Sequence, residues 1–434
     1  MYNISEDNNP ATDKDLLKDQ EKAAGRTSNS NNANTESTSN STGKEYISRI
    51  DDKTSFEWWG KPFNNNKISN SYYAEWSGYV MAHKKDRMRF FVDAQGGYKL
   101  SLNGKVVIDA IKSVSFDCRN ACIEVSPNEK ITVKLEYANH NCHPSEIRMG
   151  YMYDSDMRFD EAEKIAREAD VIVFCAGLDG TLELEGRDRP FSLPYGQDIL
   201  INKLCNINPN VVVVAQCGGG FDMSQWIDKT AAVVHAIYAG QEGGKAIADI
   251  LSGKVNPSGK LPFTIEKRWE DSPAYGNYDE TRDKKKIYYD EGIFMGYRGY
   301  DHNNTKPLFA FGHGLSYATF QYSDCKVSVK NKKNADVGIS MTIKNTGSVK
   351  GAETVQIYVH DVKSKLPRPL KELKGFEKIM LNPQESKQIE IDLKKNAFEY
   401  YDDSKHNWVL EHGKFEIWIG TASDNIKYKQ TINL

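Results

Sequence analysis

One loop crowded with charged side chains is the first place in this sequence where chemistry could occur. Residues 178–197, LDGTLELEGRDRPFSLPYGQ, contain two Glu, two Asp, two Arg and three Gly. Carboxyl groups at this density suit glycosidic bond cleavage, which needs one carboxylic acid to protonate the leaving oxygen and one carboxylate on the other side of the sugar. A Glu on such a loop could hold its proton near neutral pH, because partial burial and neighbouring charges raise the pKa of a carboxyl group.

The same residues also fit a structural role. The carboxylates of this loop could all be solvated, and Asp188 could form an ion pair with Arg187 or Arg189. Charge alone therefore leaves both interpretations open. The carboxylates concerned are Asp179, Glu183, Glu185 and Asp188.

Two other kinds of site are disfavoured. Cys118 and Cys122, with Cys142 and His143 nearby, match no zinc-ligand spacing, so buried strand cysteines are the favoured interpretation. The glycine-bearing loops AQCGGGFDM and YAGQEGGK lack both the GxGxxG spacing and the Lys-Ser/Thr pair of a phosphate loop. We therefore expect neither a metal nor an organic cofactor.

Alternating helices and apolar strands must position the charged loop. FDEAEKIAREADVIVFCAGL predicts an amphipathic helix followed by a buried strand, and QDILINKLCNINPNVVVVAQCGGG and DKTAAVVHAIYAGQEGGKAIADILSG repeat related units. This pattern is typical of a parallel sheet covered on both faces. Ligands bind at the carboxyl ends of such strands, which is where the charged loop falls.

Composition shifts divide the chain further, into a multidomain α/β plus all-β protein. Residues 1–50 form a polar segment that we expect to be disordered, because it is almost free of large apolar groups. Short alternating runs predict one β-sandwich over 51–155 and a second, of immunoglobulin or fibronectin type, over 321–434. The α/β sandwich domain occupies 156–268, and 269–320 form a connector packing on it.

Global composition limits the partners. The chain has 434 residues, enough for two to four domains, and a formal net charge of -3, which favours neither nucleic acid nor an anionic membrane. The N-terminus shows no signal-peptide pattern. Seven Cys, an odd number, fit reduced thiols better than a disulfide framework. These features predict a cytoplasmic protein.

Longer motifs resemble a known family. EGRDRPFSLPYGQ, AGQEGGKAIADILSGKVNPSGKLPFTI, DEGIFMGYRGYD and PLFAFGHGLSYATFQYS are similar to the carboxyl-terminal half of glycoside hydrolase family 3, the β-glucosidase type. NTGSVKGAETVQIYV and LKGFEKIMLNPQESKQIEIDL resemble that family's fibronectin type III-like domain. YYAEWSGYV and YKLSLNGKVVIDA look like the PA14 module that some members carry inserted in the α/β domain, so 51–155 would be a PA14-like β-sandwich.

The resemblance implies roles for particular residues. In the family, the Glu of an E-G-x-D-R segment is the general acid/base, which matches Glu185, with Glu183 as the fallback. Asp188 and Arg189 would then fix the loop. The resemblance implies retaining hydrolysis of terminal β-D-glucosidic bonds, with a β-glucoside or oligosaccharide as substrate and no cofactor.

The chain also departs from the family pattern. Family members take their nucleophilic Asp from a (β/α)8 barrel that usually precedes these domains, and no barrel sequence is present here, so the nucleophile is unknown. The first strand and helix of the α/β domain are missing as well. The chain would be either a fragment of a full enzyme or a stand-alone chain that binds carbohydrate or pairs with a separate barrel.

Overall fold

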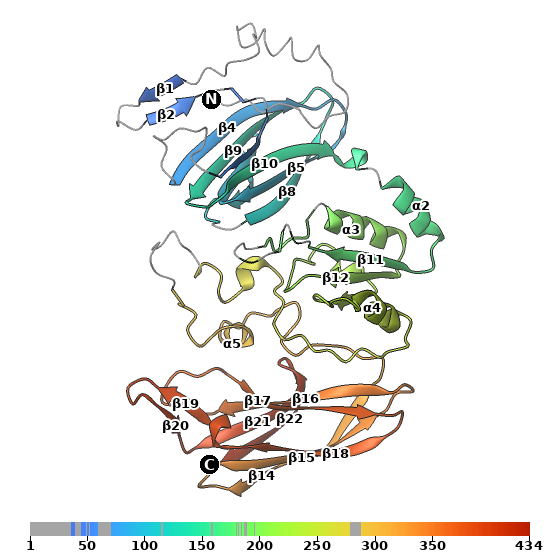
Figure 1. Cartoon of the computed structure of the whole chain (residues 1–434), viewed down its shortest axis with the longest axis vertical. Coiled ribbons are helices and arrows are strands. Elements are labelled where there is room, and N and C mark those ends of the chain that lie inside the picture. Colours follow the sequence, from blue (N-terminus) through green and yellow to red (C-terminus); the bar gives the residue numbers. More distant parts are fainter. Residues whose placement is uncertain are drawn as a thin grey trace. The chain divides into compact units, whose positions relative to one another are not determined.

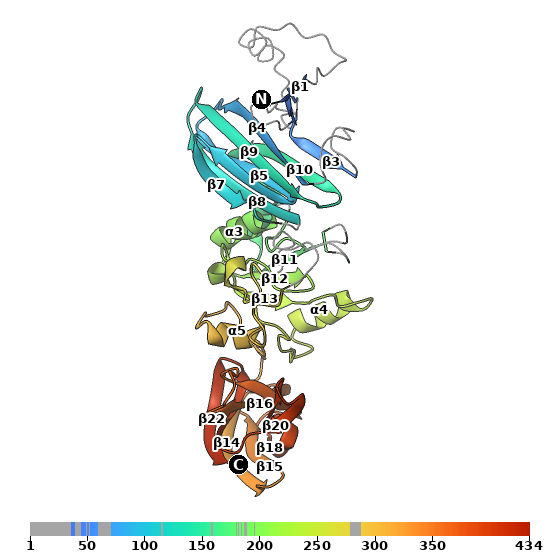
Figure 2. The same cartoon turned by 90° about the vertical axis from the view of Figure 1, so that its left-hand side faces the viewer.

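The computed structural model describes residues 36–39, 45–48, 50–51, 53–59, 71–113, 116–157, 159–178, 180, 182–183, 185, 189–194, 196–277 and 288–434. The chain forms two compact units, described separately here and shown in Figures 1 and 2. The first unit comprises 1–172, 178–208 and 279–286, and the second comprises 173–177, 209–278 and 287–434.

The first unit contains a β-sandwich whose two layers are visible in Figure 1. One sheet has the strand order β3-β10-β5-β8 and the other β4-β9-β6-β7. Alternate residues of the long strands point into the core, so that Trp76, Phe90, Leu100, Leu135 and Ile147 are completely buried. The strands are β3 Ser55–Trp58, β4 Ser71–Met81, β5 Asp86–Gln95, β6 Gly97–Leu102, β7 Lys105–Ala110, β8 Phe116–Val125, β9 Lys130–His140 and β10 Ser145–Tyr153.

Two short strands precede this sandwich. β1 (Glu36–Ser39) and β2 (Glu45–Ser48) pair antiparallel within the segment expected to be disordered. The greater part of that segment, residues 1–50, lies outside the described residues.

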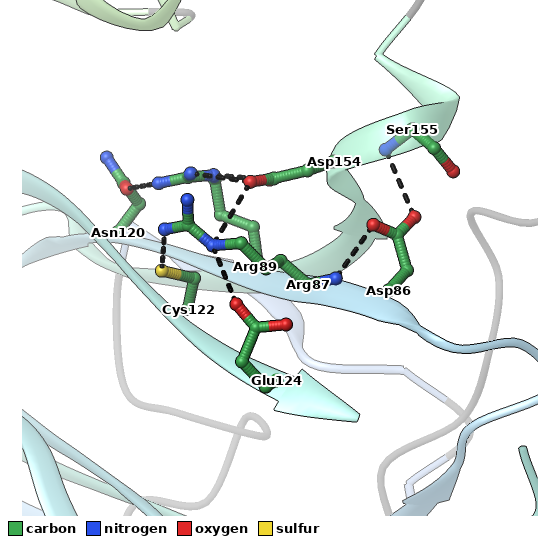
Figure 3. A network of polar contacts seen from close by, with 8 residues as sticks. All are labelled: Asp86, Arg87, Arg89, Asn120, Cys122, Glu124, Asp154 and Ser155. Atoms are coloured by element: carbon green, nitrogen blue, oxygen red, sulfur yellow. Dashed lines mark hydrogen bonds and ion pairs between the residues drawn. The ribbon is translucent and has the colours of Figure 1, made fainter. Parts of the chain in front are cut away.

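A polar network on the outer surface of the sandwich holds β5, β8 and the short 3-10 helix η2 (Asp154–Asp156) together (Figure 3). Arg89 donates Nε and Nη2 to the Asp154 carboxylate at 2.8 and 3.0 Å. Its Nη1 donates to Asn120 Oδ1 at 2.7 Å. Bidentate pairing of this kind fixes the guanidinium plane.

Two helices of the first unit pack against each other: α2 (Asp160–Glu168) and α3 (Gln197–Ile207). Asn208, at the end of α3, donates Nδ2 to the carbonyl oxygens of Ala169 at 2.7 Å and Ala166 at 3.2 Å. These carbonyls lie at the end of α2, where helix oxygens lack partners of their own. Asn208 therefore caps one helix from the other.

The second unit begins with a small sheet of order β11-β12-β13, in which β12 and β13 run parallel. β12 begins with the continuous apolar run VVVVA, and most of these side chains are buried, as expected for a strand covered on both faces. Helix α4 follows β13. The elements are β11 Ile172–Gly177, β12 Val211–Gln216, η3 Ile227–Lys229, β13 Ala232–His235, α4 Gly243–Leu251, η4 Trp269–Asp271 and α5 Tyr297–His302.

The carboxyl-terminal part of the second unit is an antiparallel sandwich of sheets β14-β15-β18 and β17-β16-β21-β22, with β19 and β20 as a separate pair (Figure 2). The core is rich in Ile and Val, and includes Ile343, Val355, Ile357 and Phe415. The elements are β14 Phe320–Asn331, β15 Asp336–Asn345, β16 Gly351–Asp361, β17 Glu372–Leu381, β18 Ser386–Leu393, η5 Lys395–Ala397, β19 Glu399–Asp402, β20 Asn407–Leu410, β21 Lys414–Ala422 and β22 Asn425–Asn433.

The segment before this sandwich contacts it directly. Gln356 of β16 donates Nε2 to the carbonyl oxygens of Thr421 at 2.6 Å and Gly312 at 3.2 Å. The Tyr297 hydroxyl accepts from the Leu373 amide at 2.8 Å. Residues of the predicted connector therefore form one compact unit with the terminal sandwich.

Strands outnumber helices in the described part of the chain, as the all-β predictions required. In that part, no helix is long and apolar enough to cross a membrane.

Candidate active site

The charged loop lies between β11 and α3, at the carboxyl end of a strand, as the sequence predicts. Residues 178–208 belong to the first unit. The structure describes Glu183, Glu185 and Arg189 in this loop, whereas Asp179, Arg187 and Asp188 lie outside the described residues. The predicted loop-fixing role of Asp188 stays a prediction.

Glu183 and Arg189 form an ion pair across the loop. The Arg189 Nε lies 3.0 Å from Glu183 Oε1, and about a fifth of each side chain is exposed, 20% and 18%. Arg189 Nη1 also donates to the carbonyl of its neighbour Pro190 at 3.3 Å. Arg189 thus contacts Glu183 and the Pro190 carbonyl, and its predicted loop-fixing role stays a prediction.

Glu185 differs from Glu183 in its surroundings. Its side chain is exposed, while Leu182 and Leu193 on either side are buried. A carboxyl group that must meet a substrate has to reach solvent, and the segments beside it must be fixed for it to be positioned. Of the two candidates, Glu185 is exposed, and Glu183 has an ion-pair partner.

Ser192 attaches the loop to the sandwich. Its hydroxyl donates to the Cys118 carbonyl oxygen of β8 at 2.6 Å, a contact between residues far apart in the sequence. The sequence analysis did not identify this role, although Ser192 lies within the conspicuous segment EGRDRPFSLPYGQ. A single hydroxyl in a loop carries no sequence signal for its distant partner.

The cysteines near this anchor are not arranged for metal binding or nucleophilic chemistry. Burial, assisted by the carboxylates of Asp93, Asp117 and Asp198, raises the pKa of Cys118 to about 12, so this thiol stays protonated at neutral pH. Among the described residues, no group of three or more His, Cys, Asp or Glu side chains could hold a metal ion. All seven cysteines lie in the described part, and none forms a disulfide.

In the second unit, the glycine-bearing loop AQCGGGFDM is a packed turn. Cys217, Phe221 and Met223 of this loop are buried. The His235 ring contacts the Gly219 carbonyl oxygen through Nε2 at 3.0 Å and lies beside Phe221. These contacts favour a structural role for the glycines over phosphate binding.

Comparison with known families identifies the class of protein. The family model described as "Glycosyl hydrolase family 3 C-terminal domain" matches residues 64–317, which is more than half of the chain. A second model, "Fibronectin type III-like domain", matches residues 353–423, within the terminal sandwich. The chain therefore belongs to glycoside hydrolase family 3 and carries its C-terminal domain.

Individual relatives are named β-glucosidases. The "Thermostable beta-glucosidase B" of Acetivibrio thermocellus is 43% identical over 291 residues, which cover 66% of this chain and 38% of that protein. The "Probable beta-glucosidase I" of Aspergillus clavatus is 35% identical over 384 residues, covering 82% of this chain and 46% of that protein.

A solved structure extends the similarity. The crystal structure of the β-glucosidase from Kluyveromyces marxianus in complex with glucose superposes with a TM-score of 0.60 at 31% identity, covering 89% of this chain and 47% of that chain. The chain spans less than half the length of each of these relatives.

Proposed function

We propose that this chain carries the acid/base half of a retaining β-glucosidase site, with Glu185 as the general acid and base. In such a reaction a carboxylate attacks the anomeric carbon while Glu185 gives its proton to the departing glycosidic oxygen. Glu185 then removes a proton from water as that water attacks the anomeric carbon and the enzyme's carboxylate leaves. The match of Glu185 to the Glu of the family's E-G-x-D-R segment supports this assignment, together with its exposure and the engagement of Glu183 in an ion pair with Arg189.

The nucleophile would come from a (β/α)8 barrel, which the chain as given does not include. Because positioning two groups on either side of the sugar supplies much of the rate, the acid/base half alone should be a very poor catalyst. The substrate would be a terminal β-glucoside, as the names of the relatives suggest. Whether the barrel belongs to the same polypeptide or to a separate one decides between a fragment and a split enzyme.

The test combines this chain with a family 3 barrel and compares two substituted forms. We expect Glu185→Gln to slow hydrolysis of alkyl β-glucosides far more than that of aryl β-glucosides with good leaving groups, because only the former need a proton at the departing oxygen. Glu183→Gln is the matched control, and should affect both substrates alike through the loop. Equal losses on both substrates for Glu185→Gln would refute the assignment.

A second candidate is a chain that binds carbohydrate or a partner without catalysis. Saturable binding of oligosaccharide with no turnover, even when the barrel is supplied, would favour it.

A further inference from the structure

Three cations converge on one carboxylate where the connector meets the terminal sandwich of the second unit. Arg368 donates Nη2 to Glu372 Oε2 at 2.6 Å. Lys374 Nζ and Arg298 Nη2 lie 3.4 and 3.8 Å from the other oxygen of the same carboxylate. Glu372 and Lys374 belong to β17, whereas Arg298 belongs to α5. The fold therefore brings together side chains that lie far apart in the sequence.

One of the three cations, Arg368, has a second set of acceptors within the protein. Its Nη1 donates to Asp361 Oδ2 at 3.2 Å and to the Phe398 carbonyl oxygen at 3.3 Å. The side chains of Arg368 and Asp361 are both largely buried. Together with Glu372, the cluster holds three cations and two carboxylates, so one positive charge is left over.

The surplus charge falls on Arg298 and Lys374. In the described part of the chain, Glu372 is the carboxylate that both side chains share, and neither pairs with another. The 3.8 Å contact of Arg298 is too long for a hydrogen bond, so the five N–H groups of its guanidinium keep their donor capacity. The Arg298 side chain is 34% exposed and that of Lys374 is 18% exposed, so a small solute can reach both. Charged donors without a matching acceptor suit an anion.

Two pKa shifts agree with this count of charges. Burial lowers the pKa of Lys374, and the two neighbouring guanidiniums add to this effect against the opposition of Glu372. Burial alone would raise the pKa of Glu372, but the three cations hold it below its ordinary value. Glu372 is therefore ionised at neutral pH, and a further negative charge beside Lys374 would favour its protonated form.

Neighbouring groups hold the two cations in place. The guanidinium carbon of Arg298 lies 5.9 Å from the centroid of the Tyr297 ring, within the range of a cation–π contact. The Tyr297 hydroxyl accepts from the amide of Leu373, the residue between Glu372 and Lys374. This contact joins α5 to β17 beside the free donors. Preorganised donors lower the entropic cost of binding an ion.

We propose that Arg298 and Lys374 form a binding site for a phosphate group, carried either by free phosphate or by a phosphate monoester. The planar fork of Arg298 matches two oxygens of a phosphate, and the Lys374 ammonium binds a third as a point charge. A carboxylate has two oxygens, and the fork alone would occupy both. The tetrahedral anion therefore suits two cations that come from different elements.

The site leaves the existing ion pairs intact. Glu372 stays paired with Arg368 through Oε2, the oxygen that faces away from the two free cations. Binding involves no bond cleavage, and it does not depend on the catalytic role proposed for Glu185.

Isothermal titration of the full chain with inorganic phosphate, at pH 7 and constant ionic strength, tests the site. We expect saturable binding of one phosphate per chain. Arg298→Gln and Lys374→Met should each weaken it about tenfold or more, because each removes one charged donor. Glu372 is left intact, because its removal would take a partner from the largely buried Arg368. Circular dichroism verifies that each variant is folded, and Arg298→Gln alone decides the outcome if Lys374→Met does not fold.

Two further ligands identify the chemistry that the site selects. Acetate supplies a carboxylate, and we expect it to bind about tenfold more weakly than phosphate or less tightly still. O-phosphoserine supplies a monoester, so tighter binding of O-phosphoserine than of phosphate would identify a monoester as the source of the phosphate group. The reverse order would identify free phosphate.

Two matched controls separate the site from the general charge of the protein. Arg268→Gln and Lys330→Met each remove an exposed cation of the second unit that has its own carboxylate partner, Asp271 or Asp392. Both should bind phosphate as the unchanged chain does. Absence of saturable binding by the folded chain, unweakened binding by Arg298→Gln, equal weakening by the controls, or equal affinity for acetate would each overturn the proposal.

Discussion

At the scale of single residues, the two glutamates of the charged loop are distinguished by their contacts. Glu183 and Glu185 lie two positions apart, and sequence alone could not separate a solvated carboxylate from a catalytic one. The ion pair of Glu183 with Arg189 gives one of them a structural task. Exposure leaves the other available to a substrate.

Asp93 illustrates the cost of burying a carboxyl group in a folded protein. A pKa of about 6, against an ordinary value of 3.8, means that the folded protein resists ionisation of this group. The difference corresponds to about 3 kcal/mol at pH 7, where the unfolded chain carries the charge freely. As pH rises from about 4 through 6, this group progressively destabilises the fold.

We therefore expect Asp93→Asn to stabilise the first unit at pH 7, by up to about 3 kcal/mol. Below about pH 3 the carboxyl is largely neutral in both folded and unfolded chains, so the gain should largely disappear. Urea denaturation at pH 7 and about pH 3 measures this difference, and Glu146 is present in both proteins, so its own titration largely cancels. A gain of the same size at both pH values would contradict the explanation.

At the scale of elements, one hydroxyl ties the charged loop to a strand. The Ser192–Cys118 contact is part-buried, and its loss leaves the Cys118 carbonyl oxygen without this donor. Such a bond contributes about 1 kcal/mol to stability. Its larger effect should be local, because the loop has its acid/base candidate only seven residues before this anchor.

Ser192→Ala should make the 178–196 loop exchange amide hydrogens faster while lowering the free energy of unfolding by only about 1 kcal/mol. Mass-spectrometric hydrogen exchange resolves the loop from the remaining chain. Ser328→Ala is the matched control, since its hydroxyl donates to the Gly338 carbonyl oxygen at 3.4 Å in the terminal sandwich. Unchanged exchange in the loop of the Ser192 variant would count against an anchoring role.

A glycine determines how the connector contacts the terminal sandwich. Gly312 has a φ of +81°, and a Cβ added there would lie 2.2 Å from Gln356 Oε1. Gln356 cannot easily yield, because it is buried and its Oε1 accepts from the Tyr358 hydroxyl at 2.6 Å. The destabilisation from backbone strain and that from the steric clash should therefore add.

Gly312→Ala should destabilise the second unit by more than about 2 kcal/mol. Gly253→Ala separates the two causes, because Gly253 has a similar φ of +74° but open space where its Cβ would be. We expect about 1 kcal/mol for this control, which carries strain alone. Urea denaturation of both variants gives the comparison, and equal losses would show that the contact with Gln356 is unimportant.

Sequence periodicity predicted the strands better than it predicted contacts between distant residues. The alternating runs identified within 51–155 correspond to β4–β10, because one buried face imposes a period of two on a strand. Periodicity also places Phe91 and Asp93 on one face. It could not show that Ser55, Asp93 and Arg148 meet, because strand register joins residues far apart in the chain.

The charged loop shows the same limit. Its position after a buried strand and its role in the family motif were readable from the sequence. The ion pair of Arg189 with Glu183 was not, because loop conformation has no periodic signal.

At the scale of the whole molecule, buried ion pairs connect segments that the sequence analysis separated. Lys371 lies in the terminal sandwich, within the fibronectin type III-like match, and pairs with Asp301 of α5 in the connector. The Lys371 side chain is 4% exposed, and that of Asp301 is 21% exposed. Burial raises the pKa of Asp301 even though Lys371 opposes the shift. The carboxylate therefore depends on its partner.

Lys371→Met should destabilise the second unit by about 3 kcal/mol at pH 7, because it leaves the Asp301 carboxylate buried without a counter-charge. The loss should shrink as pH falls and Asp301 is protonated in the folded state. Lys330→Met is the matched control, since Lys330 and Asp392 form an exposed pair at 2.6 Å whose loss should cost little stability. Replacing both charges, in Lys371→Met with Asp301→Asn, should recover much of the stability. Urea denaturation with hydrogen exchange assigns the change to the second unit, and a loss no larger than that of the Lys330 control would show that the connector and sandwich do not depend on this pair.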